Sequence, residues 1–378
     1  MTNSEDAARL RDPATFDDPF PVYDELRPRS PLQVGSRSWI LLSYDHVRAA
    51  LAEPGRFSSN VRESDNPVFR SSPLVFDDPP RHTQIRRLIT KAFTPKRVAE
   101  AEPWIRALAD ELLDTLGAGP ADFVSGFADP LPVRVIARMM GIPTDRADDF
   151  KRWSNDRSYV VYHSRGKRTP ELEAAEAGCR AQDEFFLALA DARRVRPGDD
   201  LISALATADV DGERLAPTEV AGTCSVLLSA GNLTTTRLLG NVVAVLAVDP
   251  ERYASSRRDR SLVPELVEES LRLDSPVQTP IRKTVCDVEL DGKVVPAGSF
   301  VTIGIGAANR DPAGVDQSHL AFGHGIHYCL GAALARLEAT TALHALTDRH
   351  EEIALAERPL RERSLAHRGH TRLVVRFG

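Results

Sequence analysis

One cysteine stands in a setting that favours metal chemistry. Cys329 lies in residues 322–331 (FGHGIHYCLG), directly before an alanine-rich run with helical character. The N-terminus of a helix presents unpaired N–H groups and the positive end of the helix dipole, which lower the pKa of a nearby thiol. Gly323, Gly325 and Gly331 allow a tight turn or the close approach of a flat group. The segment therefore predicts a rigid loop that offers one anionic sulfur to a metal.

Four interpretations of Cys329 stay open on these residues alone. A cysteine is commonly a small buried hydrophobic residue, and the glycines would then form an ordinary turn. Zinc would take His324, His327 and Cys329 as ligands, although no second ligand pair at zinc spacing is visible. A nucleophilic cysteine would use His327 as its base, with no third member of the site in sight. A single thiolate ligand for haem iron is the fourth interpretation.

Composition narrows the class of protein. The 378 residues carry a formal net charge of −6, which argues against general binding to nucleic acids or anionic membranes. The remaining cysteines, Cys179, Cys224 and Cys286, are far apart and form no disulfide framework, so we expect a reducing compartment. The polar N-terminal stretch contains no apolar segment typical of a signal peptide or anchor. We therefore expect a soluble, cytoplasmic protein.

Helical patterns dominate the chain that must position the cysteine loop. Residues 103–116, 217–248 and 262–273 place apolar residues at helical spacing. The longest of these is apolar through its middle, but polar residues, Arg237 among them, interrupt it. Those interruptions indicate a core helix of a soluble protein and not a membrane span.

Strand signals are fewer than helix signals. An Asp-Gly turn between short apolar runs predicts a hairpin over residues 288–295, and residues 39–42 and 372–377 predict further strands. No linker, repeat or low-complexity tract divides the chain. We expect a mainly α fold with small β-sheets, in one domain over residues 1–378.

Seven short segments, taken in their order along the chain, form a recognisable pattern. They are WILLSYDHVRAAL (39–51), DPPRHTQIRRLITKAFTP (78–95), AGNLTT (230–235), EESLR (268–272), PIRKTV (280–285), AANRDP (307–312) and FGHGIHYCLG (322–331). In this order they resemble the motifs of a cytochrome P450 of the soluble bacterial type, and the resemblance covers most of the chain. It implies the P450 fold, with haem between the long central helix and the cysteine-bearing loop.

The resemblance also implies which residues hold haem b. Cys329 would be the proximal iron ligand, and basic side chains would bind the two propionates. The implied cofactor-binding residues are His82, Arg86, Ala230, Gly231, Arg282, Phe322, His327, Cys329 and Gly331. In isolation, His82 would be interpreted as a helix-capping residue and Arg86 as a solvated charge.

The resemblance also implies which residues lie on the substrate side of the haem and which two form a supporting ion pair. Ala230 and Gly231 would be small because a flat ligand lies against them, and Thr234 would be the catalytic residue that helps to deliver protons. The Thr234 hydroxyl would also suit a hydrogen bond to a carbonyl one turn back. Glu269 and Arg272, three residues apart, would form a buried ion pair that supports the cysteine loop, where an ordinary interpretation is a surface salt bridge.

Two positions depart from the family pattern. Leu233 stands where an Asp or Glu normally precedes the threonine, and a leucine cannot relay protons. Asn232 beside it points about 100° away around the helix. Only six residues, AGVDQS, separate Pro312 from His319, so the usual longer connection with its basic residue is absent, and Arg310 or His319 would have to replace that residue.

These features lead to three functional hypotheses. The first is a haem-thiolate monooxygenase of specialised metabolism that uses O2 and a ferredoxin-type electron donor. It would bind a small or medium organic substrate near Leu227, Ala230, Thr234 and Val277. The second is a haem-thiolate enzyme that bypasses ordinary O2 activation, by using peroxide or by catalysing dehydration, isomerisation or cyclisation. The third is a non-enzymatic haem or ligand-binding protein.

Overall fold

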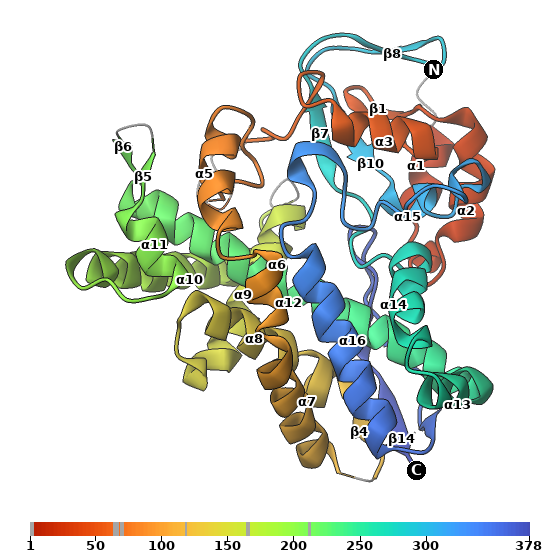
Figure 1. Cartoon of the computed structure of the whole chain (residues 1–378). Coiled ribbons are helices and arrows are strands. Elements are labelled where there is room, and N and C mark those ends of the chain that lie inside the picture. Colours follow the sequence, from red (N-terminus) through yellow and green to blue (C-terminus); the bar gives the residue numbers. More distant parts are fainter. Residues whose placement is uncertain (1–3, 63–67, 69–71, 118, 164–166, 211–212) are drawn as a thin grey trace.

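Helices dominate the molecule, which we describe from a computed structural model. The structure describes residues 4–62, 68, 72–117, 119–163, 167–210 and 213–378. The central helix α12 (Pro217–Val248) runs through the molecule, and α16 (Ala332–Arg349) crosses in front of it (Figure 1). This arrangement confirms the predicted mainly α fold with small sheets.

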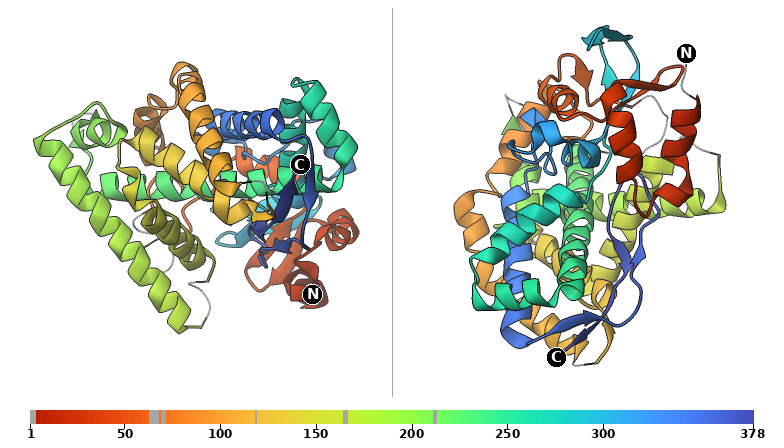
Figure 2. Two further views of the ribbon diagram at one scale, coloured as in Figure 1. Left: turned by 90° about the horizontal axis from the view of Figure 1, so that it is seen from below. Right: turned by 90° about the vertical axis from the view of Figure 1, so that its right-hand side faces the viewer.

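The remaining helices surround this central pair. They are α1 (Ser4–Arg11), α2 (Phe20–Leu26), α3 (Tyr44–Ala52), α5 (Arg81–Thr90), α6 (Pro95–Ala99), α7 (Glu102–Leu116), α8 (Pro130–Met140), α9 (Ala147–His163), α10 (Pro170–Val195), α11 (Leu201–Thr207), α13 (Pro250–Arg258), α14 (Leu262–Leu273) and α15 (Ile305–Ala308). Figure 2 shows α10 at one end of the molecule and the N-terminal helices at the other.

Most strands lie beside the N-terminal helices or near the C-terminus, and the short β5–β6 hairpin lies beside α11 (Figure 1). They are β1 (Leu32–Gly35), β2 (Ser38–Leu41), β3 (Phe57–Ser58), β4 (Ala121–Asp122), β5 (Asp209–Val210), β6 (Glu213–Arg214), β7 (Ile281–Thr284), β8 (Val288–Leu290), β9 (Lys293–Val295), β10 (Phe300–Ile303), β11 (Ile353–Leu355), β12 (Leu360–Arg361), β13 (His370–Arg372) and β14 (Val374–Phe377). The largest sheet has the order β1-β2-β10-β7-β3, in which β10 runs parallel to β2. The predicted hairpin is β8–β9, and the predicted C-terminal strand is broken at Leu373.

The three long predicted helices begin and end where the sequence places their signals. The predicted segment 217–248 is α12 itself, and α7 and α14 match their predictions to within one residue. Proline lies in the first turn of α7 and α12, where its missing N–H is not needed. Gly117, with φ of 72°, ends α7 in a conformation that favours glycine.

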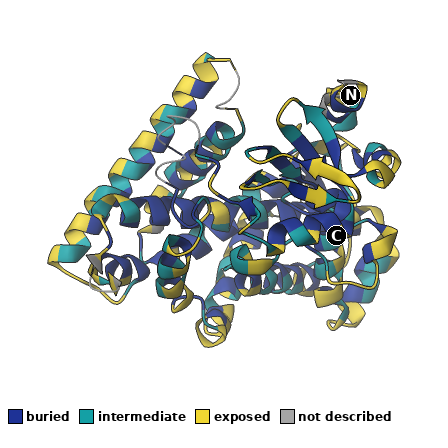
Figure 3. Ribbon diagram, turned by 90° about the horizontal axis from the view of Figure 1, so that it is seen from above, coloured by how far each residue is buried: buried dark blue, intermediate teal, exposed yellow. Residues whose placement is uncertain are grey.

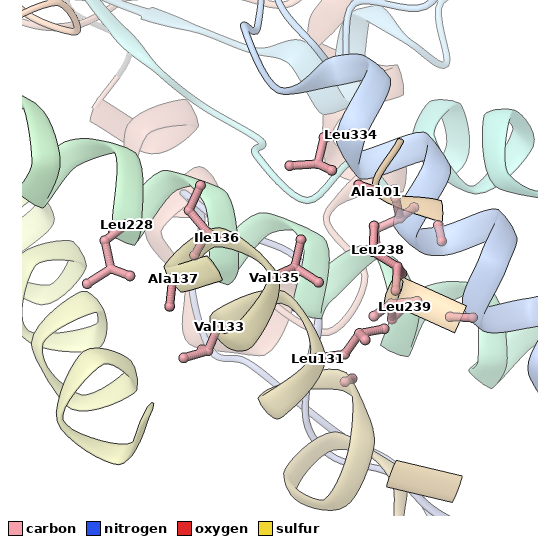
Figure 4. Packing of buried hydrophobic residues seen from close by; sticks show 14 of the residues in the cluster. Ala101, Leu131, Val133, Val135, Ile136, Ala137, Leu228, Leu238, Leu239 and Leu334 are labelled. Carbon is pink, nitrogen blue, oxygen red and sulfur yellow. The ribbon is translucent and has the colours of Figure 1, made fainter. Parts of the chain in front are cut away.

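The main hydrophobic core forms around α12. Side chains of α8 pack against it, with Leu131, Val135 and Ile136 facing Leu228 and Leu238 (Figure 4). Figure 3 shows buried residues through the interior and exposed residues along the outer helix faces. No helix in the described ranges combines the length and the apolar character needed to cross a membrane.

Candidate functional site

The cysteine loop is held in place on both sides. The Cys329 N–H donates to the Phe322 carbonyl at 2.8 Å, which closes the loop on itself. Gly323 and Gly325 have φ values of 74° and 70°, the left-handed region that favours glycine. A β-carbon at Gly325 would lie 2.6 Å from the Leu51 carbonyl oxygen in α3, so this glycine lets the loop reach α3. These contacts and the glycine conformations define the shape of the loop; its rigidity stays a prediction.

Two opposing effects act on the Cys329 thiol. Its burial raises the pKa above the ordinary value, whereas the Gly331 N–H and the charges of Arg86 and Arg336 lower it. Burial is the larger effect, so the predicted lowering of this pKa by the start of α16 is wrong for the protein alone. The Gly331 N–H at the start of α16 does lower the pKa of the thiol, but burial raises it by more.

The surroundings of the loop leave room for a flat group. A β-carbon at Gly331 would meet no protein atom within 4 Å. Ala230 is exposed although it lies in the middle of the otherwise buried α12. Within the described parts of the chain, no three His, Cys, Asp or Glu side chains form a group that could hold a metal ion. Cys329 thus offers one sulfur, which fits a haem ligand better than a zinc site.

Four basic side chains gather beside the loop from three different elements. His82 and Arg86 come from α5, Arg282 comes from β7, and His327 comes from the loop itself. The rings of His82 and His327 lie 4.3 Å apart, centroid to centroid. Arg86 donates to the Tyr328 carbonyl at 2.6 Å. The structure thus brings together the side chains that the sequence assigned to the propionates.

This cluster is short of negative charge. Burial, followed by the charges of Arg282, His82 and Arg86, lowers the pKa of His327 to about 3. Burial also lowers the pKa of Arg282 to about 10, and Asp78 only partly opposes this effect. Both ring nitrogens of His82 are buried without a hydrogen-bond partner among the residues that the structure describes. A ligand with two carboxylates would supply the missing charge and acceptors, so these residues fit haem.

In α12, the polar side chains of the segment AGNLTT (230–235) point to different neighbours. The Thr234 hydroxyl donates to the Ala230 carbonyl at 2.9 Å, the bond one turn back that the sequence allowed. The Asn232 amide donates to Ser154 of α9 at 2.7 Å, so it points away from this face as expected. Leu233 lies beside Thr234 with no carboxylate of its own.

Gly231 has a different role from the predicted one. A β-carbon at this position would lie 2.9 Å from Cγ1 of Ile136 in α8. The glycine therefore lets α8 approach α12, and helix packing accounts for its small size. Of the two small residues predicted to face a flat ligand, only Ala230 lies on an open face.

The predicted ion pair between Glu269 and Arg272 is wrong. Glu269 is exposed and pairs with Arg252 of α13, and Arg272 donates to the carbonyls of Gly314 and Gln317. Their spacing of three residues on a helix allows an ion pair, but the two side chains bind different partners.

Glu268, one residue earlier, forms the ion pair that supports the cysteine loop. Glu268 accepts from Arg336 of α16 at 2.6 Å and lies 3.1 Å from Nε2 of His319. Burial raises the pKa of Glu268, but the bonds to Arg336 and His319 outweigh it and bring the pKa to about 2. His319 thus fills the role proposed for it, although with a different glutamate.

The short connection before the loop leaves a hollow. A cavity of about 570 Å³ lies over α14 and the loop, and its lining includes Arg272, His319, His324 and Tyr328. The bonds from Arg272 nevertheless anchor the connection, and the Leu320 N–H donates to Asn309 at 2.6 Å. The connection is therefore tied down at both ends despite its length.

Several supporting residues were missed from the sequence. Ser59 hydrogen-bonds Nε2 of His327 at 2.9 Å, and Arg336 supports the loop through Glu268. Arg336 lies seven residues after Cys329, two turns along α16, and this spacing was a usable signal. Ser59, which directly follows β3, carries no sequence signal, because only the fold brings it to the loop.

Comparisons with known proteins agree with this site. The family model described as "Cytochrome P450" matches residues 186–314. The chain is 37% identical to cytochrome P450 monooxygenase PikC of Streptomyces venezuelae, over 90% of this chain and 86% of that protein. It is also 37% identical to the vitamin D(3) 25-hydroxylase of Pseudonocardia autotrophica, over 96% of this chain and 94% of that protein.

A solved structure has the same fold. CYP109E1 from Bacillus megaterium in complex with testosterone is 33% identical, with a TM-score of 0.88 over 97% of this chain and 99% of that one. These two relatives share more than a third of their residues with this chain over at least 90% of its length. The chain belongs to the cytochrome P450 family, a family of haem-binding oxidoreductases.

Proposed function

We propose that this chain is a haem-thiolate monooxygenase of specialised metabolism that acts on a small or medium organic molecule. When bound, haem with a thiolate ligand activates O2, so that one oxygen atom enters an organic substrate. The observation that carries the proposal is the loop that presents Cys329 beside His82, Arg282 and His327, a cluster short of negative charge. Relatives named as a monooxygenase and a hydroxylase support it.

The residues have distinct roles in this proposal. Cys329 would bind the iron of haem b, while the basic cluster around His82 would bind the propionates. Thr234 would hold and pass protons through its hydroxyl, the polar group on the open face of α12. The electron donor would be a ferredoxin-type protein, and the whole chain would act as one domain in the cytoplasm.

The proposal is tested by the origin of the inserted oxygen. The haem-loaded protein is incubated with testosterone, NADPH, a ferredoxin and its reductase under ¹⁸O2, and the products are analysed by mass spectrometry. We expect a hydroxylated product that carries one ¹⁸O atom and forms only with reductant. A product whose oxygen comes from water contradicts the proposal.

A second candidate function rests on Leu233. Reductive O2 activation consumes protons, and the position before Thr234 offers none here. A haem-thiolate enzyme that uses peroxide, or that catalyses dehydration, isomerisation or cyclisation, avoids this demand. Product formation without NADPH would support it.

The variant Leu233→Glu separates the two candidates further. If proton supply limits a monooxygenase, the added carboxyl group raises O2-dependent turnover by about tenfold or more, within the usual range for acid–base assistance. Leu233→Gln, which has similar size and no titrating group, is the control. Equal rates for the two variants would show that a different route supplies protons, or that different chemistry operates.

A further inference from the structure

A second large cavity lies on the substrate side of α12. It has a volume of about 810 Å³, within the range of pockets that hold drug-sized ligands. Its walls come from α1, α2, the large sheet, the end of α9 and the C-terminal loop before β13. Most of its lining is apolar or aromatic, including Leu10, Phe16, Tyr23, Ile40 and Ile281.

Arg237 connects this cavity to the proposed reaction site. It lies three residues after Thr234, about 4.5 Å further along the helix axis, and it lines the cavity. Its Nη1 donates to the Leu233 carbonyl at 2.8 Å. A molecule that fills the cavity therefore reaches to within about one helical turn of Thr234.

The charge of Arg237 is compensated inside the cavity. Its Nε and Nη2 donate to the two carboxylate oxygens of Glu362 at 2.7 Å and 3.1 Å. Arg237 is only 9% exposed and the Glu362 side chain is 27% exposed, so this is a partly desolvated bidentate pair. Arg363 and His163 also line the cavity, but both are exposed.

Two uncharged polar groups stand next to this pair with free hydrogen-bonding capacity. His367 packs edge-on against Tyr162 with ring centroids 4.8 Å apart, and both line the cavity. Among the described residues, neither the His367 ring nor the Tyr162 hydroxyl has a hydrogen-bond partner; Nδ1 of His367 is 3.9 Å from Glu362. The backbone of His367 forms an isolated antiparallel β-bridge with that of Val277, a residue that the sequence analysis expected near the substrate.

Both groups are neutral near pH 7. Burial, followed by the charge of Arg237, lowers the pKa of His367 well below its usual value. Burial raises the pKa of Tyr162 to about 12. The cavity therefore offers an imidazole with one donor and one acceptor, and a phenol hydroxyl.

A charged substrate would disturb the ion pair. A carboxylate would compete with Glu362 for Arg237, and an amine would compete with Arg237 for Glu362. Either competition breaks the bidentate pair. The amine would leave the buried Arg237 guanidinium without its partner, which is strongly unfavourable, and the carboxylate would leave the half-buried Glu362 without its partner, which is unfavourable to a smaller degree. A hydroxyl or carbonyl group can instead bond to His367 and Tyr162 and leave the pair intact.

We propose that the substrate is a neutral, largely apolar organic molecule with hydroxyl or carbonyl groups. His367 and Tyr162 bind those groups, and the Arg237–Glu362 pair selects against charged molecules. This assignment rests on the proposed function, because it takes the cavity beside Thr234 as the place where the substrate lies.

The test compares three probes that share one apolar chain. They are 1-dodecanol, dodecanoate and dodecyltrimethylammonium, whose quaternary nitrogen cannot bind iron. Their dissociation constants for the ferric, haem-loaded protein are measured by calorimetry and by the change of the Soret band. We expect the alcohol to bind at least about tenfold more tightly than either charged probe, a difference of about 1.4 kcal/mol.

Single-residue variants should change this order in opposite directions. Glu362→Gln leaves Arg237 without its carboxylate, so dodecanoate should gain about tenfold, and Arg237→Gln should give the same gain to the cation. Tyr162→Phe should weaken binding of the alcohol by about fivefold. Glu357→Gln is the matched control, because Glu357 forms an exposed pair with Arg372 on the neighbouring hairpin.

The order of affinities in the unaltered protein decides the proposal even where a variant does not fold. Binding of dodecanoate or of the cation as tight as that of the alcohol overturns it, as does the absence of binding by the alcohol. An unchanged order in Glu362→Gln and Arg237→Gln overturns the role of the pair. None of these measurements uses reductant or turnover, so their failure is distinct from failure of the proposed reaction.

Discussion

At the scale of single residues, Cys329 would determine the electronic character of haem bound as proposed. Replacing it by serine removes the sulfur and leaves a weak oxygen ligand of similar size. We expect Cys329→Ser to lose the red-shifted Soret band that thiolate ligation gives the ferrous–CO complex. The CO difference spectrum of the purified protein measures this.

The matched control is another cysteine of the same chain. Cys286 is exposed and lies outside the loop, so Cys286→Ser should keep the full band. If the band survives in Cys329→Ser, the assignment of the iron ligand is wrong. If both variants lose it, the change is not specific to the ligand.

Glu338 makes stability depend on pH. It lies in α16, is 2% exposed, and has one carboxylate oxygen that no described residue hydrogen-bonds. Burial raises its pKa well above the usual value of 4.5. The folded protein therefore holds a proton that the unfolded chain releases above pH 4.5, and stability falls as the pH rises through this window.

We expect Glu338→Gln to remove this loss of stability. The variant should equal the unaltered protein near pH 4 and exceed it at higher pH, with a gain of at most about 1.4 kcal/mol per pH unit. Denaturant unfolding at several pH values measures the difference. Glu351→Gln, at an exposed position, should show no such trend. A constant difference at all pH values would show that Glu338 does not titrate as described.

At the scale of elements, α14 is joined to α16 through Glu268 and not through Glu269. We expect Glu268→Gln to lower the free energy of unfolding at pH 7 by about 1 kcal/mol, a modest value because the carboxylate is partly exposed. The pKa of Glu268 is lowered to about 2, so its contribution is complete above pH 4.5 and fades as the pH falls toward 2. Urea unfolding of the haem-loaded protein measures both effects.

Glu269 provides a neighbouring control on the same helix. Because it pairs with Arg252 at the surface, Glu269→Gln should change stability by less than about 0.5 kcal/mol. A larger loss in Glu269→Gln than in Glu268→Gln would restore the pair predicted from the sequence.

The comparison of these two glutamates shows where sequence reasoning reaches its limit. The bounds of α12 and α14 could be predicted, because periodicity, an early proline and a terminal Asp-Ser-Pro are local signals. The partner of Glu269 could not be predicted, because it lies on α13 and depends on how two helices cross. The need for glycine at position 231 could not be predicted either, because it follows from the close approach of α8 to α12.

The site was more predictable than its supports for a physical reason. The loop around Cys329 is contiguous in sequence, so its glycines and histidines appear together. Arg237 and Glu362 are 125 residues apart, and their pairing exists only in the folded chain. The sequence showed Arg237 as an interruption of an apolar helix without giving it a role.

At the scale of the whole molecule, haem should stabilise the fold by compensating a repulsive cluster. A ligand present at 100 times its dissociation constant adds about 2.7 kcal/mol to the free energy of unfolding. We expect removal of haem to lower the thermal midpoint and its return to restore it. Protoporphyrin IX without iron keeps both carboxylates, so it should restore part of the loss. Calorimetry measures all three states.

Two variants separate the contributions of charge and sulfur. Arg282→Gln should weaken binding of both haem and the iron-free porphyrin, whereas Cys329→Ser should weaken binding of haem alone. Arg97→Gln, at an exposed position of α6, is the control. If the iron-free porphyrin does not stabilise the protein, the basic cluster does not bind propionates.

The hollow left by the short connection before the loop bears on electron transfer. It reaches His324 and Tyr328, so water approaches to within one residue of Cys329. A thiolate-ligated iron centre gains one negative charge when it is reduced, and nearby water stabilises that charge through its high dielectric constant. With haem bound to Cys329 as proposed, the reduction potential would therefore depend on this hollow. The iron should accept its first electron more readily than it would if further residues filled the hollow and excluded water.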